Sequence, residues 1–127
     1  MAVLSVDDST TIRRIVKRAV MDELGLELLE AADSIQALKL LEERAESIQL
    51  VLLDWNMPGM SGLDLLKKMK AHPRYKDIVV MMLTSEADQN CVVEALKAGA
   101  QNYMTKPFDG KILVLKIQES LGMVNKA

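Results

Sequence analysis

The sequence predicts an α/β domain in which five parallel strands alternate with five helices that cover both faces of a doubly wound sheet. Short apolar runs of strand length alternate with stretches whose apolar residues recur at helical spacing. The run at residues 49–54 is almost wholly apolar, as in a strand buried on both faces, and it ends in Asp54 before a turn at Pro58 and Gly59. At 127 residues the chain has the size of one domain, so we expect a single domain over residues 1–127.

The first half of the chain contains three strand and helix units. Short apolar runs predict strands at residues 2–6, 26–31 and 49–54. A cap at Ser9 or Thr10 begins the first helix, which ends at Gly25 and carries Ile12, Ile15, Val16, Ala19 and Val20. A cap at Asp33 or Ser34 begins the second helix, which carries Ile35, Leu38, Leu41 and Ala45. The turn-rich loop 56–62 leads into the third helix, which carries Leu65, Leu66 and Met69 and ends near His72 and Pro73.

The second half adds two more units of the same kind. The apolar runs at residues 78–84 and 101–105 predict the fourth and fifth strands. Asp88 is the predicted cap of the fourth helix, which carries Val92, Ala95 and Leu96 and stops at Gly99. Asp109 is the predicted cap of the last helix, which runs to about residues 121–122.

Composition and charge exclude several classes of protein. Half of the residues are apolar and 27% are charged, which is an ordinary globular mixture. The net charge of −2 provides no electrostatic footprint for nucleic acid or an anionic membrane. The only cysteine, Cys91, cannot form an internal disulfide, and no apolar run is long enough to span a bilayer. We therefore expect a cytoplasmic protein that binds neither nucleic acid nor membrane.

Polar residues stand where the predicted strands end. Asp7 and Asp8 follow the first strand, Asp54 ends the third, Thr84 ends the fourth, and Lys106 follows the fifth. A parallel sheet places all these ends at one edge, where such sheets bind their ligands. Three carboxylates that meet there repel one another unless a cation neutralises them. Mg²⁺ prefers oxygen ligands of this kind, together with phosphate and water, so the sequence predicts Mg²⁺ as the cofactor.

A phosphoryl group is the partner that this edge still requires. Phosphoryl transfer depends on positioning and charge neutralisation, and a carboxylate can act as the nucleophile. Asp54 is the candidate nucleophile, Lys106 supplies a cation, and Thr84 supplies a hydroxyl donor. Each residue also has a plain structural interpretation: a helix cap for Asp7 or Asp8, a strand-end hydroxyl for Thr84, and a solvated side chain for Lys106.

Other ligand sites of α/β folds fit these residues poorly. The chain contains neither the glycine-rich phosphate loop of nucleotide-binding proteins nor the dinucleotide-binding Gly-x-Gly-x-x-Gly pattern. A flavin phosphate after the first strand would be repelled by Asp7 and Asp8. One cysteine and one histidine cannot form a zinc site of the usual spacing. The lone His72 lies in a polar stretch, where we expect it to be solvated rather than catalytic.

Five motifs resemble the receiver domain of bacterial two-component response regulators over essentially the whole chain. They are Val6-Asp7-Asp8-Ser9, Leu53-Asp54-Trp55-Asn56-Met57-Pro58-Gly59-Met60-Ser61-Gly62, Leu83-Thr84-Ser85, Ala98-Gly99-Ala100 and Lys106-Pro107-Phe108. The chain looks most like the stand-alone chemotaxis type, which has no output domain. The resemblance implies a flavodoxin-like sheet with strand order 2-1-3-4-5, since the chemotaxis receiver is a known example of that order.

The resemblance also implies a role for each site residue. Asp54 takes a phosphoryl group from a histidine kinase; Asp7, Asp8, Asp54 and the backbone carbonyl of Asn56 hold Mg²⁺, with Asp8 favoured over Asp7 as a direct ligand. Thr84 and Lys106 contact the phosphoryl oxygens, and the Lys106-Pro107 bond is expected to be cis. Thr84 and Tyr103 form the switch, and Asn56 and Glu86 tune the lifetime of the phosphate. Ser85 departs from the small alanine that is frequent in the family.

The last helix carries more apolar residues than its buried face needs. Leu113, Val114, Ile117 and Leu121 share one side of a helical wheel, while Ile112 and Leu115 lie on the other side near Lys116. In the family, the surface formed by the fourth helix, fifth strand and fifth helix is the usual output face. We therefore predict a partner-binding surface that includes Tyr103, Ile112, Leu115 and Lys116, in a protein expected to be a monomer. Two scattered surface apolar residues are the alternative explanation.

Three functions are consistent with the sequence. The first is a phosphorylation-operated switch that binds a separate target, such as a flagellar motor switch or another signalling protein. The second is a phosphorelay carrier that passes the phosphoryl group to a histidine phosphotransfer protein. The third is an enzyme that turns over its own aspartyl phosphate. Tyr103 and the apolar face favour the switch, which catalyses only its own phosphorylation and dephosphorylation.

Overall fold

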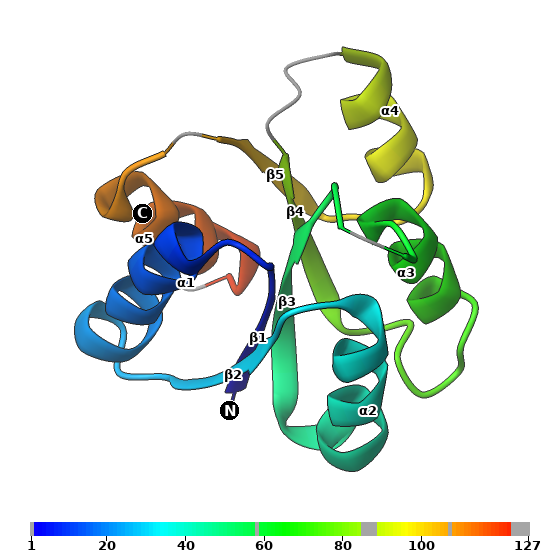
Figure 1. The fold of residues 1–127 in the computed structure, drawn as a ribbon, viewed down its shortest axis with the longest axis horizontal. Coiled ribbons are helices and arrows are strands. Elements are labelled where there is room, and N and C mark those ends of the chain that lie inside the picture. Colours follow the sequence, from blue (N-terminus) through cyan, green and yellow to red (C-terminus); the bar gives the residue numbers. More distant parts are fainter. Residues whose placement is uncertain (1, 58, 85–88, 107, 123–127) are drawn as a thin grey trace.

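The protein forms a five-stranded parallel sheet with helices on both faces (Figure 1). The structure is a computed structural model and describes residues 2–57, 59–84, 89–106 and 108–122. The strands are β1 (Ala2–Val6), β2 (Glu27–Ala31), β3 (Ile48–Asp54), β4 (Val79–Thr84) and β5 (Asn102–Thr105). The helices are α1 (Thr10–Lys17), α2 (Ser34–Arg44), α3 (Gly62–Lys70), α4 (Gln89–Lys97) and α5 (Gly110–Ser120), with short segments η1 (Arg18–Glu23) and η2 (Ala45–Ser47). None of the described helices is long and apolar enough to cross a membrane.

The strand order is β2-β1-β3-β4-β5 and every neighbouring pair is parallel, which confirms the predicted fold. Helices α1 and α5 lie on one face of the sheet, and α2, α3 and α4 lie on the other (Figure 1). The central strand β3 is buried at all positions except Gln49, as its apolar run predicts. Its alternate residues feed two cores, with Leu50 and Leu52 facing α1 and α5, and Val51 and Leu53 facing the other helices.

Side-chain caps begin the helices at the predicted places. Ser9 accepts from the backbone N–H of Ile12 at the start of α1, and Asp109 accepts from that of Ile112 at the start of α5. Asp33, rather than Ser34, caps α2. The predicted cap Asp88 lies outside the described residues.

Two helix boundaries and the exposure of one side chain differ from the sequence prediction. The first predicted helix is an α-helix only to Lys17 and continues as the π-helical segment η1, before Gly25 turns the chain with a φ of 65°. Helix α3 ends at Lys70, before His72 and Pro73, because the next residues form turns. Leu96, counted among the apolar residues of α4, is 47% exposed, because α4 turns only part of its apolar surface toward the core.

Candidate functional site

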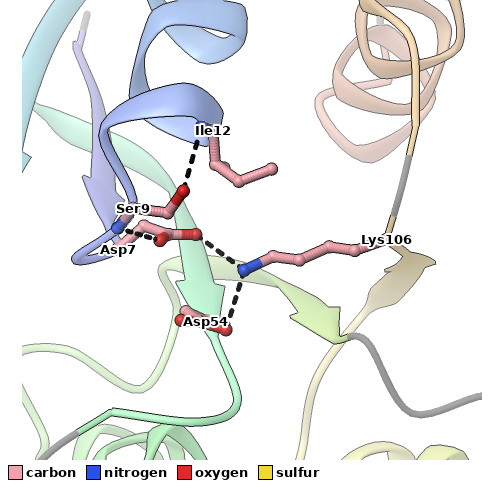
Figure 2. A network of polar contacts seen from close by, with 5 residues as sticks. All are labelled: Asp7, Ser9, Ile12, Asp54 and Lys106. Atoms are coloured by element: carbon pink, nitrogen blue, oxygen red, sulfur yellow. Dashed lines mark hydrogen bonds and ion pairs between the residues drawn. The ribbon is translucent and has the colours of Figure 1, made fainter.

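Three polar side chains meet at the carboxyl edge of the sheet, from strand ends far apart in the sequence (Figure 2). The Lys106 Nζ donates to Asp7 Oδ2 at 3.0 Å and to Asp54 Oδ1 at 3.1 Å. Strand register explains the meeting. Val6 pairs with Leu53, which puts Asp7 beside Asp54, and Thr84 pairs with Thr105, which brings Lys106 to the same edge. The lysine therefore bridges two carboxylates that stand side by side.

The acidic cluster includes a third carboxylate, Asp8. One oxygen from each of Asp7, Asp8 and Asp54 lies within 4.8 Å of the others. Asp7 is fully buried, Asp54 is 5% exposed, and Asp8 is exposed to solvent. Three hard oxygen donors this close, one of them open to water, suit a divalent cation such as Mg²⁺ that keeps several waters.

Both oxygens of Asp7 already have partners within the protein. Asp7 Oδ1 accepts from the backbone N–H of Ser9 at 2.8 Å, and Oδ2 accepts from Lys106. Ser9 in turn caps α1, so Asp7 is held by the loop that begins that helix (Figure 2). Within the described part of the chain, the Asp8 carboxylate accepts no hydrogen bond, unlike that of Asp7. This difference leaves Asp8 the better placed of the two for direct contact with a cation.

Burial governs the electrostatics of the site. Burial raises the pKa of the Asp54 carboxyl, the hydrogen bond from Lys106 opposes this, and the charge of Asp7 adds to the increase. Burial alone would lower the pKa of the Lys106 ammonium, but hydrogen bonds and charge attraction from Asp7 and Asp54 raise it overall. The ionised Asp54 is thus held at a cost in free energy, which an added cation would reduce.

The loop after Asp54 is held against the strand end by three backbone-directed hydrogen bonds. The N–H of Trp55 donates to Leu83 O at 2.9 Å, and that of Gly62 donates to Trp55 O at 3.0 Å. The buried hydroxyl of Ser34, at the first residue of α2, donates to Met60 O at 2.9 Å. Ser34 and Gly62 position this loop, although the sequence suggested Ser34 only as a possible helix cap and Gly62 only as the end of a loop motif. Their contacts join residues distant along the chain and have no local pattern.

Gly62 allows the loop to approach the backbone of Asp54. A Cβ atom at this position would overlap the carbonyl oxygen of Asp54 and lie 2.9 Å from its carbonyl carbon. Backbone atoms of a central strand cannot move aside as a flexible side chain can. Any side chain at position 62 must therefore displace either the loop or Asp54.

We expect Gly62→Ala to destabilise the protein by about 2 kcal/mol, the size typical of overpacking a rigid site. Gly110→Ala is the matched control, because a Cβ at Gly110 meets no atom within 4 Å. The control should change the free energy of unfolding by less than about 0.5 kcal/mol. Urea unfolding of both variants measures the difference, and equal stabilities would show that the close approach does not constrain the loop.

The other predicted site residues that the structure describes come from β4, β5 and the loop after Asp54. Thr84 is 2% exposed at the end of β4, and its carbonyl accepts from the N–H of Lys106 at 2.7 Å. Tyr103 lies on β5 with 38% of its surface exposed, and Asn56 is exposed in the loop after Asp54. Glu86, Ser85 and Pro107, and with Pro107 the predicted cis bond, lie outside the described residues.

The outer side of α5 carries the exposed apolar residues that the helical wheel predicts. Ile112 is 47% exposed and Leu115 is 61% exposed, while Leu113 and Ile117 are fully buried. Lys116 is half-buried beside them. Val93 and Leu96 on α4, which the sequence analysis did not assign to this surface, are also exposed at 45% and 47%. We call these residues, together with Tyr103, the α4-β5-α5 face.

Comparison with known proteins places this geometry in a family. Residues 3–118 match the response regulator receiver domain. The chain is 44% identical over 123 residues to chemotaxis protein CheY1 of Helicobacter pylori strain J99, an alignment that covers 96% of this chain and 98% of the relative. A structure of the chemotaxis response regulator CheY4 of Vibrio cholerae superimposes with a TM-score of 0.86 at 32% identity, covering 94% of this chain and 98% of that one. The Mn²⁺-bound form of response regulator Rcp1 superimposes with a TM-score of 0.82 at 25% identity, covering 98% and 96%.

Proposed function

Because the chain belongs to the response regulator receiver family, we propose that it is a phosphorylation-operated switch of two-component signalling, of the chemotaxis type. The observation that carries the proposal is the bridge of Lys106 between Asp7 and Asp54 beside Asp8, at one edge of the sheet. This edge holds a carboxylate nucleophile, a fixed cation and an acidic cluster in a space a few ångströms wide. Phosphoryl transfer requires that combination.

Asp54 is the proposed phosphoacceptor. One of its carboxylate oxygens attacks the phosphorus of a phosphohistidine on a histidine kinase. The phosphorus–nitrogen bond breaks, its electron pair returns to the nitrogen, and that nitrogen takes a proton from water as the imidazole leaves. Hydrolysis of the resulting acyl phosphate by water restores the carboxylate and releases inorganic phosphate. The chain therefore acts on its own side chain and not as an enzyme on a separate substrate.

The surrounding residues orient and neutralise the phosphoryl group. The donor set fits Mg²⁺, which Asp7, Asp8, Asp54 and the backbone carbonyl of Asn56 would hold and which would neutralise phosphoryl charge. Lys106 exchanges its contact with Asp54 for a phosphoryl oxygen and remains anchored by Asp7. Thr84 donates its hydroxyl to a second phosphoryl oxygen. The existence of a Mn²⁺-bound form of the response regulator Rcp1 supports a divalent ion as the cofactor.

Phosphorylation is transmitted by a local change of charge to the α4-β5-α5 face. In this proposal Thr84 moves toward the phosphoryl group and Tyr103, which is 38% exposed in the present structure, turns inward. Tyr103, Ile112, Leu115 and Lys116 then bind a separate downstream protein, such as a motor switch or another signalling protein. Asn56 and Glu86 set how long the phosphate persists.

A phosphorelay carrier is the second candidate. Such a carrier needs the phosphorylation site, while a conformational switch of its own matters less. The exposure of Ile112 and Leu115, with Val93 and Leu96 nearby on α4, favours a protein that binds a target. Rapid transfer of the phosphoryl group from Asp54 to a histidine phosphotransfer protein, without phosphorylation-dependent target binding, would favour the carrier.

The experiment that tests the site uses Trp55, the only tryptophan and the neighbour of Asp54. We expect its fluorescence to change when Mg²⁺ is added, because the acidic cluster lies beside it, and to change again with beryllofluoride, a phosphoryl mimic. Asp54→Asn should lose the second change. An unchanged signal in both steps, with Asp54→Asn behaving like the wild type, would contradict the site assignment.

The double variant Ile112→Ser with Leu115→Ser should weaken target binding by the beryllofluoride-activated protein at least tenfold, or about 1.4 kcal/mol. Two exposed apolar side chains would then no longer be buried at the interface. Titration calorimetry with the target protein measures the effect. Ile35→Ser is the control, because Ile35 is 76% exposed on α2, on the opposite face of the sheet. Unchanged binding by the double variant would exclude these residues from the interface.

A further inference from the structure

A groove separate from the phosphorylation site lies between α1–η1 and the start of α5, two elements that lie side by side on one face of the sheet (Figure 1). Its volume is about 540 Å³, within the range of small-molecule sites. It is lined by Arg14, Ile15, Arg18, Ala19, Glu23, Asp109, Gly110 and Lys111. None of Asp7, Asp8, Asp54 or Lys106 is among these residues, so the groove shares no residue with the phosphorylation site.

Two arginines on one side of the groove are placed where they repel each other. Arg14 and Arg18 stand four residues apart on a continuous helical segment, so their side chains are neighbours. Like charges at this spacing destabilise a helix, and within the described part of the chain neither arginine forms an ion pair. Arg13, also on α1, pairs instead with Glu30 of β2 at 3.6 Å. Both side chains are exposed, so water and dissolved ions screen this repulsion, and an anion bound in the groove would neutralise it.

The third cation is also in a locally unfavourable position. Lys111 lies in the first turn of α5, where the helix dipole disfavours positive charge. It too forms no ion pair among the described residues. The acid nearest in sequence, Asp109, is occupied as the helix cap, because its Oδ1 accepts from the N–H of Ile112 at 2.9 Å. Glu23, the other acid that lines the groove, forms no ion pair among the described residues.

The backbone beside the arginines departs from α-helical geometry. Segment η1 is π-helical from Arg18 to Glu23, and it contributes Arg18, Ala19 and Glu23 to the groove. Single π turns occur often at functional sites. Ile15 and Ala19 supply an apolar wall between the charged residues. Three cations in unfavourable positions and a π turn therefore converge on one cavity, and functional sites are where such local departures are expected.

We propose that this groove binds a small phosphomonoester whose phosphate is attached to an apolar body. A phosphomonoester carries a charge of about −1.5 to −2 near pH 7, so it neutralises a pair of arginines better than one carboxylate does. Guanidinium groups match phosphate oxygens with paired hydrogen bonds. Ile15 and Ala19 then contact the apolar body. The proposal goes beyond the phosphorylation switch and does not depend on it.

Adenosine monophosphate is a suitable probe, because it joins a phosphate to an aromatic base whose ring faces can pack against the apolar wall. We expect a ¹⁵N NMR titration of the full chain, without Mg²⁺, to shift the amides of Ala19, Gly110 and Lys111. Adenosine alone and inorganic phosphate alone should each bind at least tenfold more weakly than the nucleotide. The double variant Arg14→Gln with Arg18→Gln should also bind the nucleotide at least tenfold more weakly. Arg13→Gln, which changes the neighbouring arginine outside the groove, should bind as the wild type does.

Four results would overturn the proposal. The first is the absence of shifts in these amides at millimolar nucleotide, and the second is wild-type binding by the double variant. The third is equal binding of inorganic phosphate and nucleotide, which would remove the role of the apolar wall. The fourth is binding of an acidic peptide in the groove by a protein that ignores the nucleotide, which would make the groove a protein-docking surface. Retained Mg²⁺-dependent Trp55 fluorescence in the double variant would verify that the variant is folded and that the two sites are separate.

Discussion

Asp54→Asn should abolish formation of the acyl phosphate. An amide has no ionised oxygen to attack phosphorus, and no other described carboxylate lies at the end of the central strand β3 with a lysine beside it. Asp7 is fully buried with both oxygens occupied by Ser9 and Lys106, so it is a poor substitute. We therefore expect a loss to the detection limit rather than a partial decrease.

The fold of Asp54→Asn should be retained. The amide nearly matches the volume of the carboxylate, and burial already raises the pKa of Asp54, which means that the folded protein disfavours its charge. Lys106 keeps Asp7 as a partner in the variant. A failure to phosphorylate will thus report chemistry and not unfolding, which circular dichroism can verify.

Intact-protein mass spectrometry after treatment with a small phosphodonor and Mg²⁺ measures the effect. The wild type should gain one phosphoryl group that hydroxylamine removes, as expected of an acyl phosphate. Asp33→Asn is the matched control, because it removes an acid of the same type and retains a good cap for α2. Phosphorylation of Asp54→Asn at the wild-type rate would show that the acceptor is another residue.

Lys106→Met should destabilise the Mg²⁺-free protein by about 3 kcal/mol, the lower end of the range for removing one partner of a buried ion pair. The side chain of Lys106 is 16% exposed, and the side chains of its partners Asp7 and Asp54 are 0% and 7% exposed. Without it, two carboxylates face each other with no cation between them. Methionine preserves most of the apolar stem, so the loss isolates the charge.

Added Mg²⁺ should raise the free energy of unfolding of Lys106→Met by more than it raises that of the wild type, because the metal replaces the lost cation. The pH window for the comparison is wide. The pKa of Lys106 is raised above its ordinary value of 10.5. The stabilisation that its charge gives the fold is therefore fully present below the ordinary pKa and is lost as pH rises through the folded pKa. Measurements near pH 7 therefore capture all of it.

Urea unfolding with and without Mg²⁺ tests this prediction. Lys39→Met is the control, since Lys39 is exposed on α2 and forms no ion pair among the described residues. It should change the free energy of unfolding by less than about 0.5 kcal/mol. If Lys106→Met unfolds at the wild-type midpoint with and without Mg²⁺, the bridge between Asp7 and Asp54 does not stabilise the fold.

Some features of the site follow from residue order alone. Apolar runs predict all five strands within about two residues of their observed bounds, and the caps Ser9 and Asp109 follow from their side-chain chemistry. Once the strands are parallel, the residues after them must lie at one edge. Asp7, Asp54 and Lys106 could thus be assigned to one site from the sequence, because each position is set by local structure plus one topological rule.

Other features depend on contacts between distant segments. The hydrogen bond from Ser34 to Met60 spans 26 residues, and the fit of Gly62 against Asp54 depends on how the loop returns to its own strand. The exposure of Leu96 depends on how α4 is rotated against the sheet. Neither periodicity nor local propensity contains this information.

The sequence by itself thus determined the fold class and the set of polar residues at the sheet edge, because periodicity and capping are properties of neighbouring residues. Only the tertiary structure decided that Lys106 bridges Asp7 and Asp54, that Asp8 is the exposed acid, and that Arg14, Arg18 and Lys111 share a groove. These outcomes depend on strand register and on the packing of α1 against α5. Both are set by the fit of whole elements and not by any one segment.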